Sequence, residues 1–316
     1  MAEQRRRAVV AVGGNSLIKD ESHRAMPYQE EAAAETMRHI AEMISAGWEV
    51  VITHGNGPQV GYLLRRSELS RHELHEIPLD YCGADTQGAT GYMFAKALRN
   101  EFALRGLDKQ VAAIVTQTVV DRSDAAFENP TKPVGSFMDE ATAKERAEKE
   151  GWRVVKDANR GWRRVVPSPA PVRIVEAPVI RMLLEAGVVV IGAGGGGIPV
   201  VEDERGLLRG IAAVIDKDHS SALLANTVGA ELFLISTAVE RVALNFGKPD
   251  ERPLSKITLE EARRYREEGH FAKGSMEPKI SAAISFLERG GREAIITNPE
   301  GIPRALAGEA GTRIVP

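Results

Sequence analysis

The feature that most constrains the fold is a run of small residues near the middle of the chain, Gly192-Ala193-Gly194-Gly195-Gly196-Gly197, which directly follows Val188-Val189-Val190-Ile191. The β-branched segment predicts a strand buried on both faces, as in a parallel sheet. Glycines at the end of such a strand let a ligand approach the backbone, and successive N–H groups in a turn form a hollow that binds anions. A flexible glycine linker is the alternative, but apolar, strand-like residues flank the run on both sides. The run therefore predicts a phosphate-binding turn.

The same run contains the spacing Gly-x-Gly-x-x-Gly at Gly192, Gly194 and Gly197, which raises the alternative of a dinucleotide-dependent oxidoreductase. That motif needs a helix that begins at the third glycine. The chain continues instead with Ile198-Pro199-Val200-Val201, which predicts an extended segment. The context therefore disfavours dinucleotide binding.

Predicted strands and helices alternate along most of the chain. Apolar or β-branched runs predict strands at 8–12, 49–53, 110–120, 188–191, 211–215, 232–236 and 293–297. Apolar residues at helical spacing predict helices at 30–46, 86–105, 177–186, 220–228, 259–268 and 280–289. This alternation is typical of an α/β fold, in which helices cover both faces of an open, mainly parallel sheet.

The alternation breaks between residues 121 and 171. A stiff turn at 129–133 is followed by a charged helix at 144–150, a hairpin-like segment at 151–166 and a proline-rich end at 167–171. We interpret 121–171 as a protruding subdomain, a lid inserted into a single domain that spans 1–316. No internal repeat or low-complexity tract is visible.

Composition limits the classes of function. The formal net charge of −3 argues against nucleic acid or an anionic membrane as the main partner. No apolar run is long enough to cross a bilayer. Cys82 is the only cysteine, so we expect no intrachain disulfide and a cytoplasmic location. The seven histidines lack ligand spacing, which predicts no structural metal site.

Glycine-rich turns follow several of the predicted elements. They lie at 13–14, 55–57 and 192–197, and another precedes the helix after Gly274. Open α/β sheets bind ligands outside the carboxyl ends of their strands. Four such turns on one rim predict a site for a polyanionic ligand.

Three lysines in or beside turns are candidate cations for that site. Lys217 lies between Asp216 and Asp218, directly after an apolar segment where a solvated face would not begin. Lys279 is placed just before a helix, whose N-terminus also favours negative charge. Lys132 lies between two prolines that restrict the backbone, which suits a residue that must reach one point.

Lysines, an aspartate and glycine backbones are the groups that phosphoryl transfer requires, because its catalysis is mainly positioning and charge neutralisation. The aspartate would orient the lysines or hold Mg²⁺. The chain has no Gly-x-x-x-x-Gly-Lys-[Ser/Thr] motif and no protein-kinase motifs. His54, the one candidate for a different chemistry, lacks a partner serine motif and is better explained as a hydrogen-bonded histidine at a strand end.

Seven segments of the chain carry a resemblance to a known family. They are 11–15, 53–61, 129–135, 161–169, 194–200, 214–218 and 274–279. Together they resemble the carbamate kinases of the amino acid kinase superfamily. The resemblance runs nearly end to end, and the segments at 129–135 and 161–169 separate carbamate kinases from acetylglutamate, aspartate and uridylate kinases.

The resemblance implies a three-layer α/β/α sandwich that forms a homodimer. It also implies reversible phosphoryl transfer from ATP to carbamate, with Mg²⁺ bound to the ATP, and a role in arginine metabolism. Carbamate is already an oxyanion, so no enzymic base is required. By position, the resemblance makes Lys132, Lys217, Asp218 and Lys279 catalytic. It also implies that phosphate or substrate is held by Gly13, Gly14, Asn15, Gly55, Asn56, Gly57, Gly195 and Gly196, and nucleotide by Lys217, Asp218, Ser275, Met276 and Lys279.

Two positions depart from the family pattern. Ala238 stands where many relatives have aspartate, so a polar nucleotide contact there is in doubt. Glu277 stands where relatives often have glycine, and we expect its carboxylate to point to solvent, away from phosphates. Two other hypotheses stay open: a related kinase that acts on another small acceptor, and a non-catalytic nucleotide sensor.

Overall fold

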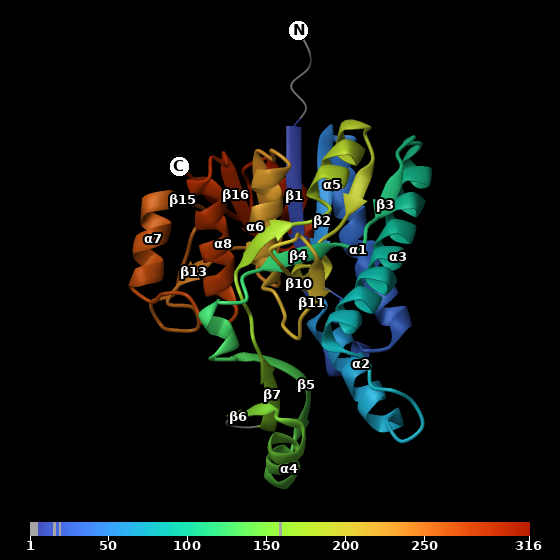
Figure 1. Ribbon diagram of the computed structural model, residues 1–316. Coiled ribbons are helices and arrows are strands. Elements are labelled where there is room, and N and C mark those ends of the chain that lie inside the picture. The colour runs from blue at the N-terminus through green and yellow to red at the C-terminus, as the bar shows by residue number, and fades with distance from the viewer. Residues whose placement is uncertain (1–5, 15–16, 19, 158–159) are drawn as a thin grey trace.

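The computed structural model of the protein describes residues 6–14, 17–18, 20–157 and 160–316. Within these residues, the central strands are β1 (Arg6–Val12), β2 (Trp48–His54), β3 (Val111–Ala113), β9 (Val189–Ile191), β12 (Leu232–Ser236), β15 (Lys256–Thr258), β16 (Glu293–Thr297) and β17 (Thr312–Val315). They form one eight-stranded sheet in the order β15-β17-β16-β12-β1-β2-β9-β3 (Figure 1). From β3 to β16 each strand pairs in parallel with its neighbour, and β17 pairs antiparallel with β16. The predicted mainly parallel sheet is confirmed.

Helices cover both faces of this sheet. The helices of the described residues are α1 (Met26–Ser45), α2 (Gly57–Ser70), α3 (Leu79–Arg105), α4 (Glu140–Glu150), α5 (Ala177–Glu185), α6 (Lys217–Thr227), α7 (Leu259–Glu267), α8 (Met276–Glu288) and α9 (Ile302–Leu306). Successive side chains of a strand point to opposite faces, so Ala8, Val10 and Val12 pack with α1, α3 and α9, while Val9 and Ala11 pack with α5, α6 and α8. The three-layer α/β/α sandwich is confirmed. None of the helices in the described residues is both long and apolar enough to span a membrane.

The expectation of one strand over 110–120 is wrong. After β3 the chain leaves the large sheet and enters β4 (Gln117–Val120), which belongs to a second sheet with β8 (Pro171–Ile174), β10 (Ile198–Glu202) and β11 (Leu208–Gly210). Between β3 and β4, the buried side chain of Gln87 accepts a hydrogen bond from the Thr116 N–H at 2.7 Å and donates one to the Thr116 carbonyl at 3.1 Å. The Thr116 carbonyl also accepts a hydrogen bond from the Ile198 N–H at 2.9 Å, so Gln87 and the start of β10 together satisfy the backbone where the chain changes sheets.

The segment between β4 and β8 extends away from the large sheet (Figure 1). It contains α4 and a third sheet of β5 (Lys132–Met138), β7 (Gly161–Val166) and β6 (Arg153–Asp157). The hairpin expected at 151–166 is confirmed, because β6 and β7 pair antiparallel. The helix expected at 144–150 begins earlier, at Glu140, because Asp139 caps it by accepting a hydrogen bond from the Thr142 N–H at 2.7 Å.

The predicted strand at 211–215 is also wrong, because these residues are irregular. Ala213 and Ile215 are almost fully buried, and the Val214 N–H donates to the Pro167 carbonyl at 3.0 Å. The segment is apolar because tertiary packing buries it, with Val214 against the cluster that contains Val60, Leu79 and Val134, and not because it pairs in a sheet. Two short strands, β13 (Ala243–Leu244) and β14 (Arg252–Pro253), complete the regular strands of the described residues.

Candidate active site

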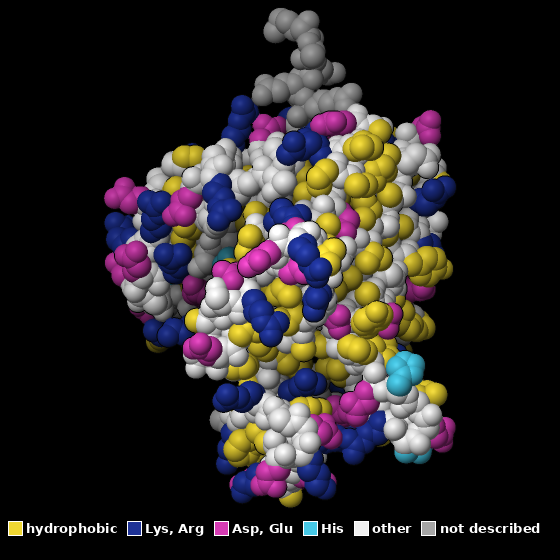
Figure 2. Space-filling model, viewed as in Figure 1, with side chains coloured by type: hydrophobic (Ala, Val, Ile, Leu, Met, Phe, Trp, Pro, Cys, Tyr) yellow, Lys and Arg dark blue, Asp and Glu magenta, His cyan; other side chains and the backbone are white. Residues whose placement is uncertain are grey.

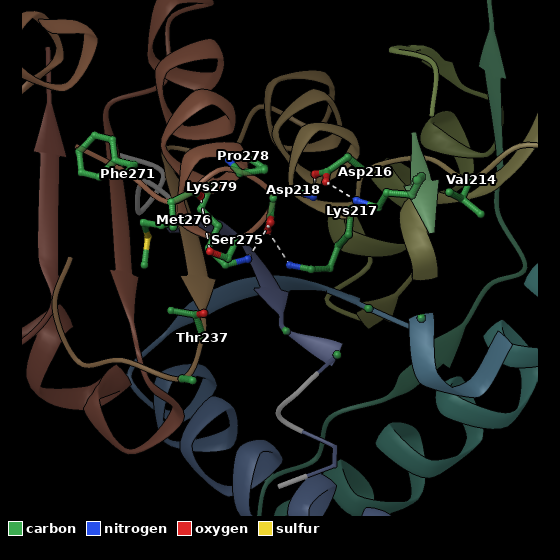
Figure 3. A pocket seen from close by; sticks show the side chains of 18 of the residues that line it. Val214, Asp216, Lys217, Asp218, Thr237, Phe271, Ser275, Met276, Pro278 and Lys279 are labelled. Carbon is green, nitrogen blue, oxygen red and sulfur yellow. Dashed lines mark hydrogen bonds and ion pairs between the residues drawn. The ribbon is translucent and has the colours of Figure 1, made fainter. Parts of the chain in front are cut away.

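A cavity of about 530 Å³ lies at the carboxyl ends of β1, β2 and β12 (Figure 3). Parallel strands end at the same edge of a sheet, so turns far apart in the sequence meet there. The first turns of α6 and α8 border the cavity, and Lys132 reaches it from β5. Of the predicted site residues, those lining it are Gly13, Gly14, Gly55, Asn56, Gly57, Lys132, Gly195, Lys217, Asp218, Ser275, Met276 and Lys279.

Asp218 holds two lysines side by side in this cavity (Figure 3). Its Oδ1 accepts a hydrogen bond from Lys217 Nζ at 2.5 Å, and its Oδ2 accepts one from Lys279 Nζ at 2.9 Å. All three side chains are largely buried, with 6 % of Asp218, 11 % of Lys217 and 15 % of Lys279 exposed. Burial opposes the ionisation of Asp218, but the two lysine charges outweigh it and lower its pKa. Burial lowers the pKa of Lys217 against the opposing pull of Asp218.

Asp216 links β5 to the start of α6. Its Oδ1 accepts hydrogen bonds from the N–H of Asp218 at 3.0 Å and of His219 at 3.4 Å, which makes it the N-cap of the helix. Its Oδ2 accepts a hydrogen bond from Lys132 Nζ at 3.3 Å. Burial would raise the pKa of Asp216, but His219, Lys132 and Lys217 together hold that pKa far below its ordinary value. Asp216 is therefore an anion in contact with both segments.

The two helices whose first turns border the cavity, α6 and α8, begin earlier than the sequence predicts. The helix expected from 220 begins at Lys217, because Asp216 caps it. The helix expected from 280 begins at Met276, so Lys279 lies within the first turn of α8 and not before it. Pro278 is tolerated there because the first turn needs no donated hydrogen bond at that position. Both helix N-termini now face the cavity, and both favour bound anions.

Close backbone contacts require glycine at two of the turns. A Cβ atom on Gly55 would lie 2.7 Å from the backbone nitrogen of Gly14. At Gly195, where φ is +66°, a Cβ atom would lie 2.2 Å from the side-chain nitrogen of Asn56. Asn56 is held in place by its own hydrogen bond to Thr86 Oγ1 at 2.8 Å. The three turns therefore approach one another more closely than any side chain would permit.

Two of the predicted phosphate-binding residues are not among those that the structure places in the cavity wall. Gly196 packs against the segment before α6, where an added Cβ atom would lie 2.6 Å from the carbonyl oxygen of Ile215. Asn15 lies outside the described residues. After the glycine turn the chain enters β10 directly, so the extended segment predicted at 198–201 is confirmed and no α-helix opens at Gly197.

His54 is a buried, neutral histidine at the end of β2. Its Nδ1 lies 3.2 Å from the Gly55 carbonyl oxygen, and its ring packs edge-on against Phe94. Burial, assisted by the charge of Lys217, lowers the pKa of His54 to about 4. The interpretation of His54 as a hydrogen-bonded histidine at a strand end agrees with this geometry.

The far end of the cavity is apolar, and its aromatic residues were not identified from the sequence. Phe271 and Met276 lie there, away from Lys217 (Figure 3). Phe246, which is 66 % exposed, also borders it. Other lining residues not identified from the sequence include Thr237, Val239, Arg241, Ala243, His270 and Ala272. One signal was available in the sequence, because the turn-forming residues Asn245 and Gly247 flank Phe246, and in the structure both adopt positive φ in a turn.

The two departures from the family pattern have different surroundings. Ala238 lines the cavity. Glu277 is not among the described lining residues; it is partly buried, and its Oε1 accepts a hydrogen bond from Ser281 Oγ at 2.7 Å. The expected solvent-facing carboxylate is therefore bonded to its own helix. Among the described residues, no group of three His, Cys, Asp or Glu side chains is arranged to hold a metal ion.

Comparisons with known proteins agree on one family. The amino acid kinase family matches the chain over residues 6–298. The chain is 51 % identical to the carbamate kinase of Thermococcus kodakarensis, over 98 % of this chain and 99 % of that protein. It is 49 % identical to the carbamate kinase-like protein YahI of Escherichia coli, over 97 % of this chain and 98 % of that protein. A solved structure of carbamate kinase from Giardia lamblia bound to AMP-PNP superposes with a TM-score of 0.94 at 41 % identity, covering 99 % of both chains.

Proposed function

The chain belongs to the amino acid kinase family, and we propose that it catalyses reversible phosphoryl transfer between ATP and carbamate, giving ADP and carbamoyl phosphate. The observation that carries this proposal is the pair of ammonium groups held on the two oxygens of Asp218, beside glycine turns that leave room for phosphate. The similarity to carbamate kinases over nearly the whole chain supports carbamate as the acceptor.

The chemistry is a displacement at the γ-phosphorus of ATP. A carbamate oxygen forms a bond to this phosphorus, the bond to the β,γ-bridging oxygen breaks, and ADP leaves with the electron pair. Because charge spreads over the phosphoryl oxygens in the transition state, fixed cations supply most of the catalysis. Lys217 neutralises the transferred group, Lys279 binds the nucleotide phosphates, and Asp218 orients both lysines. No histidine or glutamate base is needed, because carbamate is an anion.

The glycine turns hold the acceptor and the transferred phosphoryl group. Gly13, Gly14, Gly55 and Gly57 present backbone to the cavity without side chains, and Gly195 does the same from the turn after β9. The hydrogen bond to Thr86 fixes the side-chain orientation of Asn56, which suits a residue that must contact one oxygen atom. Asn15, which also follows β1 in sequence, is included in this group on the resemblance alone.

Mg²⁺ enters with ATP as part of the substrate. Asp218 offers little for a metal ion, because both its oxygens already accept hydrogen bonds from lysines. This arrangement supports orientation of lysines as the role of Asp218, in preference to metal coordination. The ion is therefore expected to be held mainly by phosphate oxygens and water, as Mg²⁺ in such sites often is.

The apolar end of the cavity is suited to the nucleotide base. Phe246, Phe271 and Met276 offer apolar and aromatic surface at the far end from Lys217, and rings stack well on a planar base. Ser275, at the N-terminal edge of α8, lies between this end and Lys279. The nucleotide would therefore lie along the cavity with its phosphates toward the lysines.

The protruding subdomain, residues 121–171, acts as a lid on an otherwise single domain, and Lys132 is the residue it brings to the transferred phosphoryl group. Lys132 begins β5 and already lies 3.3 Å from Asp216. A cluster of apolar side chains packs the base of the subdomain against α2 and the start of α3, through Val60, Leu64, Leu79, Cys82, Val134 and Val166. Small shifts at this base would move Lys132 toward or away from the cavity.

The protein is further proposed to be a homodimer that works in the cytoplasm, where its substrates ATP and ADP are present, with a role in arginine metabolism. Large exposed apolar side chains support a dimer, and Figure 2 shows apolar side chains gathered on the flank formed by α3 and α5. The exposed apolar side chains of these helices include Tyr92 and Leu104 on α3 and Val179 and Met182 on α5. A contiguous apolar surface of this kind is typical of an interaction site.

A coupled assay tests the reaction directly. Purified protein is given Mg²⁺ and ADP with carbamoyl phosphate, acetyl phosphate or acetylglutamyl phosphate in separate reactions, and ATP is measured. We expect ATP to form fastest, by at least about tenfold, from carbamoyl phosphate; discrimination between small substrates of this size is within reach of one pocket. Faster reaction with either other acyl phosphate would show a related kinase with a different acceptor. No ATP from any of the three would refute the proposed reaction and favour the non-catalytic nucleotide sensor.

A further inference from the structure

His219 lies one residue beyond Asp218 in the first turn of α6, and its ring turns back toward Asp216. The ring Nδ1 is 3.4 Å from Asp216 Oδ1, and 38 % of the His219 side chain is exposed. Neither the lysine arrangement nor the glycine turns involve this ring. Its partner is the carboxylate that Lys132 also contacts.

The two oxygens of Asp216 serve different segments. Oδ1 accepts hydrogen bonds from the N–H groups of Asp218 and His219 and faces the His219 ring, so its contacts are all with α6. Oδ2 lies 3.3 Å from Lys132 Nζ, so it contacts the protruding subdomain. A carboxylate can rotate about its Cβ–Cγ bond, since that torsion is soft. Contacts that fix Oδ1 therefore also fix the direction of Oδ2.

Charged groups surround the His219 ring on several sides. The carboxylates of Asp216, just before α6, and of Asp218, on α6, interact electrostatically with the ring, as does Glu277 on α8. Lys132 contacts the other oxygen of Asp216. The contact with Asp216 raises the pKa of His219 above its ordinary value, although burial opposes this. Whether charged or neutral, the ring can present an N–H at Nδ1 to Asp216.

We infer that His219 is a positioning residue: its ring fixes the carboxylate of Asp216 so that Oδ2 stays aimed at Lys132, which sets where the protruding subdomain closes over the cavity. The kinetic consequence rests on the proposed function, because it needs Lys132 to act on the transferred phosphoryl group. The contact itself does not, and can be followed without any activity. A purely structural role, such as stabilising the end of α6, would make no use of Lys132.

A positioning role and a purely structural role of His219 therefore differ in one respect: only in the positioning role does the effect of changing His219 depend on Lys132. The variants are His219→Ala, which removes the ring, and His219→Asn, whose side-chain N–H can occupy the position of Nδ1. Each is made in the unchanged protein and in Lys132→Ala. His72→Ala is the matched control, because His72 is 71 % exposed and lies outside the cavity lining. kcat and the KM for ADP are measured for ATP formation from carbamoyl phosphate.

With Lys132 present, we expect His219→Ala to lower kcat by roughly tenfold, the scale of one hydrogen bond to a charged group, with the KM for ADP unchanged. His219→Asn should retain kcat within about twofold of the unchanged protein. In the Lys132→Ala background, neither His219→Ala nor His219→Asn should lower kcat further, because His219 acts through Lys132. Equal losses in both backgrounds, or no rescue by asparagine, would overturn the inference.

Hydrogen exchange gives a readout that needs no turnover. Exchange of the β5 amides, residues 132–138, is compared by mass spectrometry in the same variants without ligand. Faster exchange in His219→Ala and in Lys132→Ala, but not in His219→Asn or His72→Ala, supports the contact. Unchanged β5 exchange in His219→Ala would refute it. If the unchanged protein forms no ATP, the proposed function fails, and this experiment still decides whether His219 positions Lys132 through Asp216.

Discussion

Replacing Lys217 by methionine removes the most buried of the three ammonium groups while keeping a side chain of similar length. Lys217 is 11 % exposed, against 15 % for Lys279 and 42 % for Lys132. Three ammonium groups face two carboxylates here, so the loss of Lys217 removes the excess positive charge that attracts a phosphoryl group. At an effective dielectric constant of about 20, two unit charges about 4 Å apart interact by about 4 kcal/mol. The part realised only in the transition state is about 3–4 kcal/mol for one such stabiliser, so we expect kcat to fall by about 10²–10³.

The assay is ATP formation from carbamoyl phosphate and ADP, coupled to hexokinase and glucose-6-phosphate dehydrogenase. kcat and KM are determined for both substrates, and the dissociation constant of ADP is measured separately by calorimetry. Lys144→Met is the matched control, because Lys144 is 68 % exposed and lies on α4, away from the cavity. Among the ion pairs of the described residues, Lys144 pairs only with Glu140 on the same helix. It should retain kcat within about twofold, because exposed ion pairs contribute about 0–1 kcal/mol.

A loss in kcat of less than about fivefold would refute the electrostatic reasoning, which requires more than about 1 kcal/mol. So would a large loss of ADP affinity with kcat unchanged, because it would mean that Lys217 serves only to bind nucleotide. Circular dichroism and the melting temperature establish whether Lys217→Met is folded. If it is not, Lys217→Gln, which keeps a polar group beside Asp218, replaces it in the same measurements.

Three further changes test other parts of the site. Lys132→Ala should lower kcat by at least about tenfold and change ADP affinity less than threefold by calorimetry; a large loss of ADP affinity would contradict its lid role. Gly195→Ala forces a Cβ atom against Asn56 at a positive φ, so we expect kcat to fall and the free energy of unfolding in urea to fall by about 1–3 kcal/mol. A free energy of unfolding within error of that of the unchanged protein would show that the turn relaxes freely. The pKa of His54 is about 4 when folded and 6.5 ordinarily, so the unfolded chain takes up the proton first. His54 therefore costs the protein up to about 3 kcal/mol of stability as the pH falls from about 6.5 to about 4, and nothing above that range. In His54→Gln, urea titrations at pH 7.0 and 4.5 should show a smaller fall in stability, and an equal fall in both proteins would rule out this contribution.

The local pattern of the chain was sufficient for the layers of the fold. Apolar runs placed β1, β2, β9, β12 and β16 within a few residues, because a strand buried between helices must be apolar throughout. The glycine turns and the lysines beside them were visible for the same reason: an unusual residue at a strand end stands out locally. Several segments also carried the resemblance to carbamate kinases that the family match agrees with.

Local patterns failed where burial came from the tertiary structure. The segment 211–215 is as apolar as a strand, but tertiary packing buries it outside any sheet. The chain at 110–120 changes sheets at Thr116, whose backbone bonds to Gln87, a residue far back in the sequence, and to Ile198. Helix α6 begins at Lys217 because the Asp216 side chain caps it, and that depended on a carboxylate orientation that residue spacing does not specify.

The arrangement of charges at the site was decided by the fold alone. The sequence determined that Lys132, Lys217 and Lys279 lie in or beside turns near glycine-rich strand ends. Only the tertiary structure decided that Lys217 and Lys279, 62 residues apart along the chain, share the two oxygens of Asp218, and that Lys132 takes Asp216 instead. The physical reason is that a hydrogen bond depends on positions to within a few tenths of an ångström. Sheet order and helix packing set such positions, whereas the periodicity of apolar residues sets only which face of an element is buried.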